Sequence, residues 1–514
     1  MVSLHKDLAD NRDVVRLLEV VLALLIPTLF FFLVLDFSHP GRVFEYDTDE
    51  GMCLMRGFLH AEGYHLYKEI WMDSPPFLVI LLSGLFRITG PSVFHARLLF
   101  LAFSTLLVWG LFKIISKTQN LLAALFTVGL LIISSFYVRL SVSVMIGLPA
   151  VALAILSVYA LLLYETGYQK RYLALSGCLL ALALQTKFFV ITFLPALISE
   201  IVIIERGRLE KERLIKRSVS AVAYWGVSLA AVYLYLAFVA ASVDFSQIIG
   251  PYAILRDIGV SSAFQGYPVV QEWILGENGL ALMALGGFIF LGRKERRFFL
   301  LPLICSILGI LILSNHVPIW YHHRLLVIVP MCWLASFGFY KLFNRETWSG
   351  WGSKGRFFKI KDTLAILFLG SVLILTVVEL PSKYERMTKE ARRKPFIGKY
   401  RRVINLMERY KEKTRLVVTD RPIFSFYAGL PVHPYLTTSS KKRIDAGLLT
   451  AEDFIGIIQK EHPELILFAR FPELRDRIAP HIEGAYELEY QNRDDSIRLY
   501  VLEKMKRDRE KGRL

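Results

Sequence analysis

Residues 45–76 read Glu-Tyr-Asp-Thr-Asp-Glu-Gly-Met-Cys-Leu-Met-Arg-Gly-Phe-Leu-His-Ala-Glu-Gly-Tyr-His-Leu-Tyr-Lys-Glu-Ile-Trp-Met-Asp-Ser-Pro-Pro. This charged stretch directly follows the first long hydrophobic segment, and it is too long and too polar to be a simple connector. It puts the carboxylates of Asp47, Asp49, Glu50 and Asp73 next to a predicted membrane span. We expect carboxylates at a membrane surface to act on a ligand or a substrate.

The hydrophobic residues, 54% of the 514 in the chain, occur in blocks of about twenty, the length that a helix needs to cross a bilayer. The sequence therefore predicts a mostly α-helical, polytopic membrane protein. The first block is longer than a signal-peptide core and lacks a small-residue cleavage site, so we interpret it as a retained transmembrane helix. We predict about eleven spans, at residues 15–36, 95–113, 119–138, 146–164, 172–186, 188–204, 218–242, 279–292, 298–314, 324–343 and 363–379.

The basic residues predict how the chain crosses the membrane. The net charge is +16, and Lys and Arg gather in alternate connectors, as in cytoplasmic loops. This pattern argues against a nucleic-acid partner and places the N-terminus in the cytoplasm of a plasma-membrane protein. Residues 75–90 are apolar but short, and a full span there would put the basic loops outside. We therefore interpret them as an interfacial or half-inserted helix on the outer face.

The predicted organisation has two domains. Residues 1–379 form the membrane domain, with a long first outer loop at 37–94, and residues 380–514 form a small extracytoplasmic α/β domain. Residues 416–419 and 465–468 read as buried strands, and 495–502 alternates like a late strand. Residues 399–412 and 451–461 read as helices. No glycine-rich phosphate loop follows a strand, which argues against nucleotide binding.

Asp49 and Glu50 are the leading catalytic candidates. A carboxylate there can take a proton from an attacking hydroxyl or amine, or hold a divalent cation. The alternative is a solvated helix cap, because Asp47, Thr48 and Asp49 are all good N-cap residues. Asp73 precedes the prolines that start the 75–90 helix, so it is expected to cap that helix or to bind substrate on the same face.

Cationic candidates lie in later outer loops. Lys187 separates two apolar runs, and Arg139 lies between the third and fourth predicted spans. Both suit a lipid phosphate, with snorkelling at the interface as the alternative. His322 and His323 occur in a short loop and suit phosphate or sugar contacts, or packing at the interface. Adjacent histidines rarely share one metal ion, and no Cys or Asp accompanies them.

Several short motifs occur in an order that resembles the GT-C glycosyltransferases, especially the protein O-mannosyltransferase and aminoarabinose-transferase branch. The resemblance covers about residues 40–380. It rests on Asp49-Glu50-Gly51, Pro75-Pro76, Phe94-His-Ala-Arg97-Leu98-Leu99, Leu148-Pro149-Ala150, Leu182-Ala-Leu-Gln-Thr-Lys187 and Tyr321-His322-His323.

The resemblance implies a reaction. Such enzymes move a sugar from a polyprenyl or dolichyl phosphate to a lipid, glycan or protein acceptor on the outer membrane face, with inversion. Asp49 matches the first-loop aspartate of the family and is the expected general base. Lys187 and Arg139 are the expected partners of the leaving phosphate, with His322 or His323 as weaker candidates. The prenyl tail would lie between helices in the bilayer. The sequence indicates no certain cofactor, and a divalent cation such as Mg²⁺ or Mn²⁺ is compatible with the carboxylates.

The chain departs from the family pattern in two places. Related enzymes often carry a second acidic residue in the second outer loop, but residues 139–149 contain none, and Gly147 lies near the expected place. The aminoarabinose branch has a lysine before Pro-Pro, where this chain has Ser74. The second carboxylate could be Glu50 or Asp73. A transporter or flippase of lipid-linked sugars and a non-catalytic glycan-assembly protein remain the alternatives.

Overall fold

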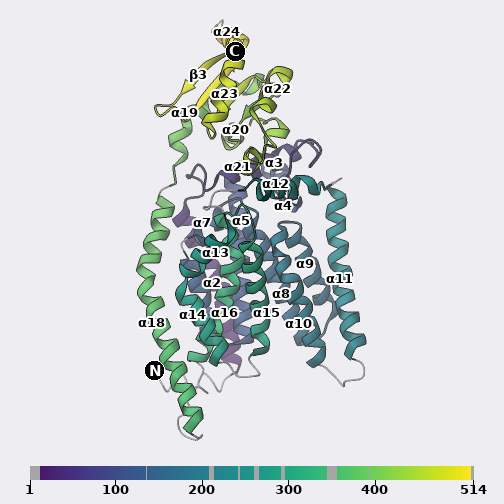
Figure 1. Ribbon diagram of the computed structural model, residues 1–514, viewed down its shortest axis with the longest axis vertical. Coiled ribbons are helices and arrows are strands. Elements are labelled where there is room, and N and C mark those ends of the chain that lie inside the picture. Colours follow the sequence, from purple (N-terminus) through teal and green to yellow (C-terminus); the bar gives the residue numbers. More distant parts are fainter. Residues whose placement is uncertain are drawn as a thin grey trace.

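The computed structural model describes residues 12–134, 136–207, 214–240, 243–259, 265–290, 296–343, 356–392 and 394–510. A bundle of long helices occupies one end and a small α/β domain the other, with a layer of short helices between them (Figure 1). Several basic residues of the predicted inner connectors lie outside the described residues, namely Arg208, Lys211, Arg213, Arg293, Lys294, Arg345 and Lys354.

Each predicted span coincides with a helix of the bundle. Within the part of the chain that the structure describes, eight helices are long and apolar enough to cross a bilayer. The number becomes nine if α13 (Gly266–Leu275) and α14, which are bent by 81° at their junction, count as one span. The bundle helices are α2 (Arg12–Ser38), α5 (Val93–Thr118), α6 (Leu121–Ile133), α8 (Gly147–Gly167), α9 (Lys170–Leu184), α10 (Phe193–Gly207), α11 (Leu214–Val239), α14 (Asn278–Phe290), α15 (Arg296–Ser314), α16 (Leu325–Phe343) and α18 (Arg356–Arg392).

The predicted number of about eleven spans is therefore not confirmed. The structure makes α6 only 13 residues long and α9 only 15. At 1.5 Å per residue, α9 is about 22 Å long, which is less than the roughly 30 Å of a bilayer core. These helices complete the bundle by packing against longer neighbours.

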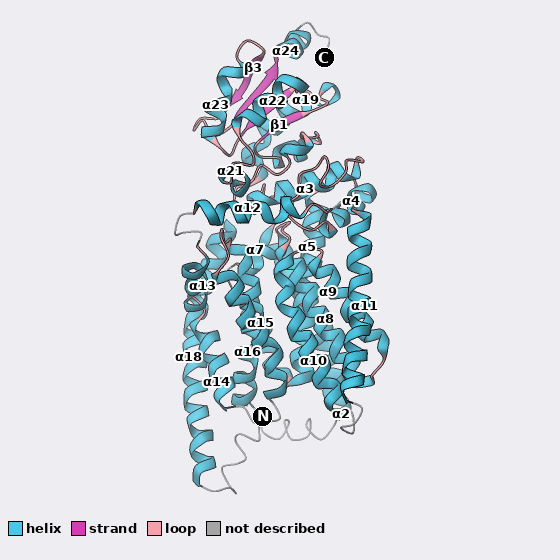
Figure 2. Cartoon of the chain, turned by 45° about the vertical axis from the view of Figure 1, so that its right-hand side comes forward, coloured by secondary structure: helices cyan, strands magenta, loops and turns pink. Residues whose placement is uncertain are grey.

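The short helices lie between the bundle and the α/β domain (Figure 2). They are α3 (Thr48–Ala61), α4 (Phe77–Thr89) and α12 (Phe245–Ile258). The short helix α7 (Tyr137–Val142) packs against the bundle helices α2, α5 and α6. At 13 residues, α4 is too short to span a membrane, as predicted for residues 75–90. The predicted cap of α4 by Asp73 is wrong, because no side chain caps this helix. The predicted cap of α3 is confirmed, since the Asp47 carboxylate accepts the Asp49 N–H at 3.0 Å.

The α/β domain contains a four-stranded sheet in the order β1-β2-β4-β3, with strands β1 (Val417–Thr419), β2 (Leu465–Phe468), β3 (Tyr486–Gln491) and β4 (Arg498–Leu502). Strands β1 and β2 are parallel, and the other pairs are antiparallel. The helices are α19 (Arg401–Arg409), α20 (Ile423–Ala428), α21 (Lys441–Asp445), α22 (Ala451–Glu461), α23 (Pro472–Ile482) and α24 (Glu503–Glu510). The three predicted strands are present, but β3 was missed because its pattern is mostly half-exposed and charged.

The α/β domain shares its hydrophobic core with the first loop. Phe44 is fully buried and lies 4.3 Å and 4.7 Å, ring to ring, from Tyr400 and Phe424. Helices α3 and α20 approach so closely at Gly51 that a Cβ there would lie 2.7 Å from Ile423. This continuous core fixes the α/β domain on the first loop, and the candidate site lies beneath that junction.

Candidate active site between the helical bundle and the α/β domain

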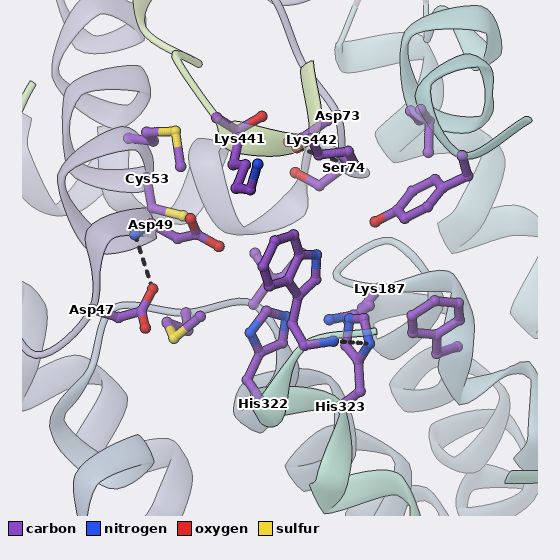
Figure 3. Close-up of a pocket in the computed structure, with 18 of the residues that line it drawn as sticks. Asp47, Asp49, Cys53, Asp73, Ser74, Lys187, His322, His323, Lys441 and Lys442 are labelled. Atoms are coloured by element: carbon purple, nitrogen blue, oxygen red, sulfur yellow. Dashed lines mark hydrogen bonds and ion pairs between the residues drawn. The ribbon is translucent and has the colours of Figure 1, made fainter. Parts of the chain in front are cut away.

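A cavity of about 620 Å³ lies where the bundle, the first loop and the α/β domain meet. Figure 3 shows its charged side chains gathered around one central space. Five of the predicted site residues line it: Asp49, Asp73, Lys187, His322 and His323. The wall also includes Asp47, Cys53, Arg56, Ser74, Phe188, Phe189, Ile248, Ile249, Tyr252, His316, Tyr321, Lys441, Lys442 and Arg470.

Asp49 lies in the first turn of α3, and its carboxylate points into the cavity (Figure 3). Within the described part of the chain, no basic side chain forms an ion pair with it. Burial and the nearby Asp47 carboxylate raise the pKa of Asp49 to about 6, partly offset by Arg470. Because that pKa lies close to neutrality, the carboxylate is suited to accept a proton from a substrate.

Glu50 points the other way, into the protein. Its side chain is fully buried and holds Arg97 through two hydrogen bonds of 2.8 Å each. It also accepts the N–H groups of Tyr46 and Val144, and Arg97 donates to three carbonyls of residues 40–44. Glu50 does not line the cavity. We therefore correct its predicted catalytic role to a structural one, which ties the first loop to α5.

Asp73 lines the cavity but already has two cationic partners. Its carboxylate contacts Arg56 at 2.8 Å and Lys442 at 3.1 Å. These two cations hold the pKa of Asp73 well below its usual range, against the effect of burial. Arg56 also donates to the Thr438 hydroxyl of the α/β domain. Asp73 therefore stays anionic and joins the two domains, which does not suit a proton acceptor.

Lys187 lies in the connector between α9 and a short 3₁₀ helix (Phe188–Thr192). Its side chain is buried, lines the cavity and lies 5.4 Å from the centre of the Phe189 ring. The described residues place no carboxylate oxygen within ion-pair distance of its ammonium group. Burial and the nearby Lys442 lower the pKa of Lys187 to about 7. A buried ammonium group of this kind is suited to bind an anion that enters the cavity.

Arg139 occupies a different place from the one predicted. Its guanidinium contacts the Asp47 carboxylate at 3.2 Å and lies 4.4 Å from the centre of the Tyr321 ring. The Tyr321 hydroxyl donates to the same carboxylate at 2.8 Å. Arg139 does not line the cavity. We therefore correct its predicted role as a phosphate ligand: it holds Asp47, the residue that caps α3 next to Asp49.

The histidines form one wall of the cavity. His322 and His323 belong to a short 3₁₀ helix (Tyr321–Arg324), and their ring centres are 4.5 Å apart. Burial and the positive charge of Lys187 lower the pKa of His316 to about 3, so this imidazole is neutral. The His322 carbonyl would lie 3.3 Å from a Cβ on Gly147. There is accordingly little room at Gly147 for the acidic side chain that related enzymes often carry in this loop.

Two cationic residues of the α/β domain were missed in the sequence. Lys442 is buried against Asp73, and Arg470 donates to the Thr48 hydroxyl at 3.1 Å beside Asp49. The only sequence feature that could have indicated Lys442 is the basic run Lys441-Lys442-Arg443, and such a run is usually solvent-exposed. Their sequence distance of several hundred residues from the first loop hides the contact.

The described residues contain no group of three His, Cys, Asp or Glu side chains arranged to hold a metal ion. Asp47 and Asp73 already pair with arginine or lysine. The described residues therefore offer no preformed metal site, and the divalent cation stays a prediction.

Residues 73–245 match the sequence profile of a family described as Dolichyl-phosphate-mannose-protein mannosyltransferase. No curated protein sequence matches the chain. Among solved structures, the fold is similar to ArnT from Cupriavidus metallidurans bound to undecaprenyl phosphate, with a TM-score of 0.60, 15% identity, and 94% of this chain and 97% of that chain covered. It is also similar to the apo oligosaccharyltransferase of Archaeoglobus fulgidus, with a TM-score of 0.54, 13% identity, and 91% and 72% covered.

The fold, the family profile and the cavity together define a class. The chain is a polytopic membrane protein with the GT-C fold, and its predicted resemblance to the GT-C superfamily is confirmed. At this low identity the solved structures establish the fold only.

Proposed function

We propose that the chain is a glycosyltransferase that moves a sugar from a polyprenyl or dolichyl phosphate to an acceptor on the outer face of the plasma membrane. One observation carries the proposal: the Asp49 carboxylate and the Lys187 ammonium group line the same cavity, and neither has an ion-pair partner among the described residues. A base for the acceptor and a cation for the donor phosphate are the two groups that this reaction needs.

The charge of the cavity supports an anionic donor. Five basic side chains line it, against three acidic ones, namely Arg56, Lys187, Lys441, Lys442 and Arg470 against Asp47, Asp49 and Asp73. Apolar side chains such as Phe188 and Ile249 share the wall and suit the first isoprene units. Two similar folds support this choice, since ArnT was solved with undecaprenyl phosphate and AglB of Archaeoglobus fulgidus with an inhibitory peptide and a dolichol-phosphate.

The proposed step is one in-line displacement. The acceptor hydroxyl or amine attacks the anomeric carbon and gives its proton to the Asp49 carboxylate. The bond from the anomeric carbon to the phosphate oxygen breaks, and its electron pair stays on that oxygen. The Lys187 ammonium group stabilises this developing charge. The configuration at the anomeric carbon is inverted, and the products are the glycosylated acceptor and the polyprenyl phosphate.

The test compares cells that lack the protein with cells that carry wild type or Asp49→Asn. We expect the lipid-linked sugar to accumulate and one glycan to disappear in the deletion strain, as measured by mass spectrometry of lipids and glycans. Asp49→Asn should reproduce both effects at wild-type protein levels. A transporter or an assembly protein would instead keep its function with Asp49→Asn, so full complementation by that variant would contradict the proposal.

A further inference from the structure

The mechanism above gives no task to Lys442, a buried cation of the α/β domain that lines the cavity. We propose that Lys442 is a second ligand of the donor phosphate, so that the phosphate is held between Lys187 of the membrane domain and Lys442 of the α/β domain. This inference rests on the proposed function and assigns part of its substrate site to the α/β domain.

Lys442 is placed as a ligand would be. Its side chain is only 5% exposed, yet it lines the cavity near Ser74 (Figure 3). Its Nζ atom lies 3.1 Å from the Asp73 carboxylate and 4.0 Å from the centre of the Tyr252 ring. These contacts fix the ammonium group in one position, and a fixed cation binds an anion with little loss of conformational entropy.

The charge around Lys442 is not balanced. Asp73 is shared between Lys442 and Arg56, so a single carboxylate faces two cations. Lys187 adds a third positive charge and Asp49 a second negative one, so three cations face two carboxylates, and repulsion from Lys442 contributes to the lowered pKa of Lys187. Buried charges are costly unless a partner of opposite sign is present. An anion between the two lysines would supply that partner.

The chemistry of the donor explains why two lysines would be useful. In the donor the phosphate is a diester with one negative charge. When the bond to the sugar breaks, the phosphate becomes a monoester whose charge approaches −2, since the second pKa of such a group is about 6. A second cation therefore stabilises the leaving group more than the bound donor, and this difference speeds the chemical step.

The binding test uses full-length protein in lipid nanodiscs and farnesyl phosphate as the probe, with farnesol as the uncharged comparison. Lys442→Gln removes the charge, and its amide can still donate to Asp73. We expect the Kd of this variant for farnesyl phosphate to rise about tenfold or more, whereas its Kd for farnesol should not change. Lys442→Arg should recover most of the affinity. Lys460→Ala, on the exposed surface of the same domain, is the matched control and should bind like wild type.

Each outcome has a defined meaning. If Lys442→Gln binds farnesyl phosphate like wild type while Lys187→Met binds it weakly, the role of Lys442 is refuted and the proposed function stands. If wild-type protein binds farnesyl phosphate no better than farnesol, the proposed function itself fails. If Lys442→Gln does not fold, the turnover of Lys442→Arg is measured in its place. Because this variant keeps the positive charge, it should retain a substantial part of the wild-type kcat. Loss of kcat in a folded Lys442→Arg protein would contradict the inference.

Discussion

Asp49 and Glu50 are neighbours in the sequence, but the structure gives them opposite surroundings. Glu50 is fully buried, and Arg97 and two backbone N–H groups satisfy its oxygens. Asp49 faces the cavity with no ion-pair partner among the described residues, and its pKa is raised. A carboxylate whose partners are complete stabilises the fold. A carboxylate whose surroundings are incomplete is available for a substrate.

The largest expected effect is the loss of turnover in Asp49→Asn. The amide keeps the size of the side chain but cannot accept the acceptor's proton, so we expect kcat to fall by about 10²- to 10⁴-fold. The unfolding temperature should stay that of wild type. Glu62→Gln, at the exposed end of the same helix, is the control for a lost carboxylate. Wild-type turnover in Asp49→Asn would remove the general base from the mechanism.

Glu50→Ala should fail in the opposite way, through stability. It leaves the Arg97 guanidinium buried without its carboxylate, at a cost of about 3–5 kcal/mol. We expect low yield and a lower midpoint of thermal unfolding in detergent. The double variant Glu50→Leu/Arg97→Leu should be more stable than Glu50→Leu alone, because it no longer buries an unpaired guanidinium group. A stable but inactive Glu50→Ala protein would instead favour a catalytic role for Glu50.

Lys187→Met should weaken the donor site without unfolding the protein. The substitution removes the ammonium group that binds the donor phosphate and stabilises its developing charge, and it keeps the apolar stem. We therefore expect kcat/KM for the donor to fall about tenfold or more. The control is Lys170→Met, which lies at the start of α9, the helix that precedes Lys187. It should behave like wild type. An unchanged KM and kcat in Lys187→Met would place the phosphate elsewhere.

The plot of kcat/KM against pH should have an acidic limb set by Asp49 and an alkaline limb set by Lys187. Asp49 must be deprotonated to act as a base, and its pKa is raised to about 6, so activity should rise through that pH. Lys187 must be protonated to bind the phosphate, and its pKa is lowered to about 7, so activity should fall above it. Lys187→Arg should remove the alkaline limb only. A profile that stays flat well below the pKa of Asp49 and well above that of Lys187 would contradict both assignments.

The sequence predicted much of the site because its signals are local. Asp49 follows a hydrophobic span at the start of a helix, and Lys187 interrupts an apolar stretch. The sequence could not decide between Asp49 and Glu50. Adjacent side chains of a helix point about 100° apart, and only tertiary contacts show which of the two meets Arg97.

The remaining parts of the site depend on contacts between distant segments. Lys442 and Arg470 reach the first loop only because the α/β domain shares a core with it through residues such as Phe44 and Phe424. Arg139 was assigned to the substrate phosphate, because a pattern of charges does not reveal that Asp47 and Tyr321 contact its guanidinium. The predicted span 119–138 is longer than α6, because packing against longer helices lets α6 stay short, whereas the predicted span 172–186 has the length of α9.

The most direct test of the central claim is a structure of the full-length protein in nanodiscs with a bound polyprenyl phosphate. We predict phosphate density in the cavity within hydrogen-bond distance of Lys187, with the Asp49 carboxylate across the space that a sugar would fill. A phosphate bound outside this cavity, or one with no contact to Lys187, would contradict it.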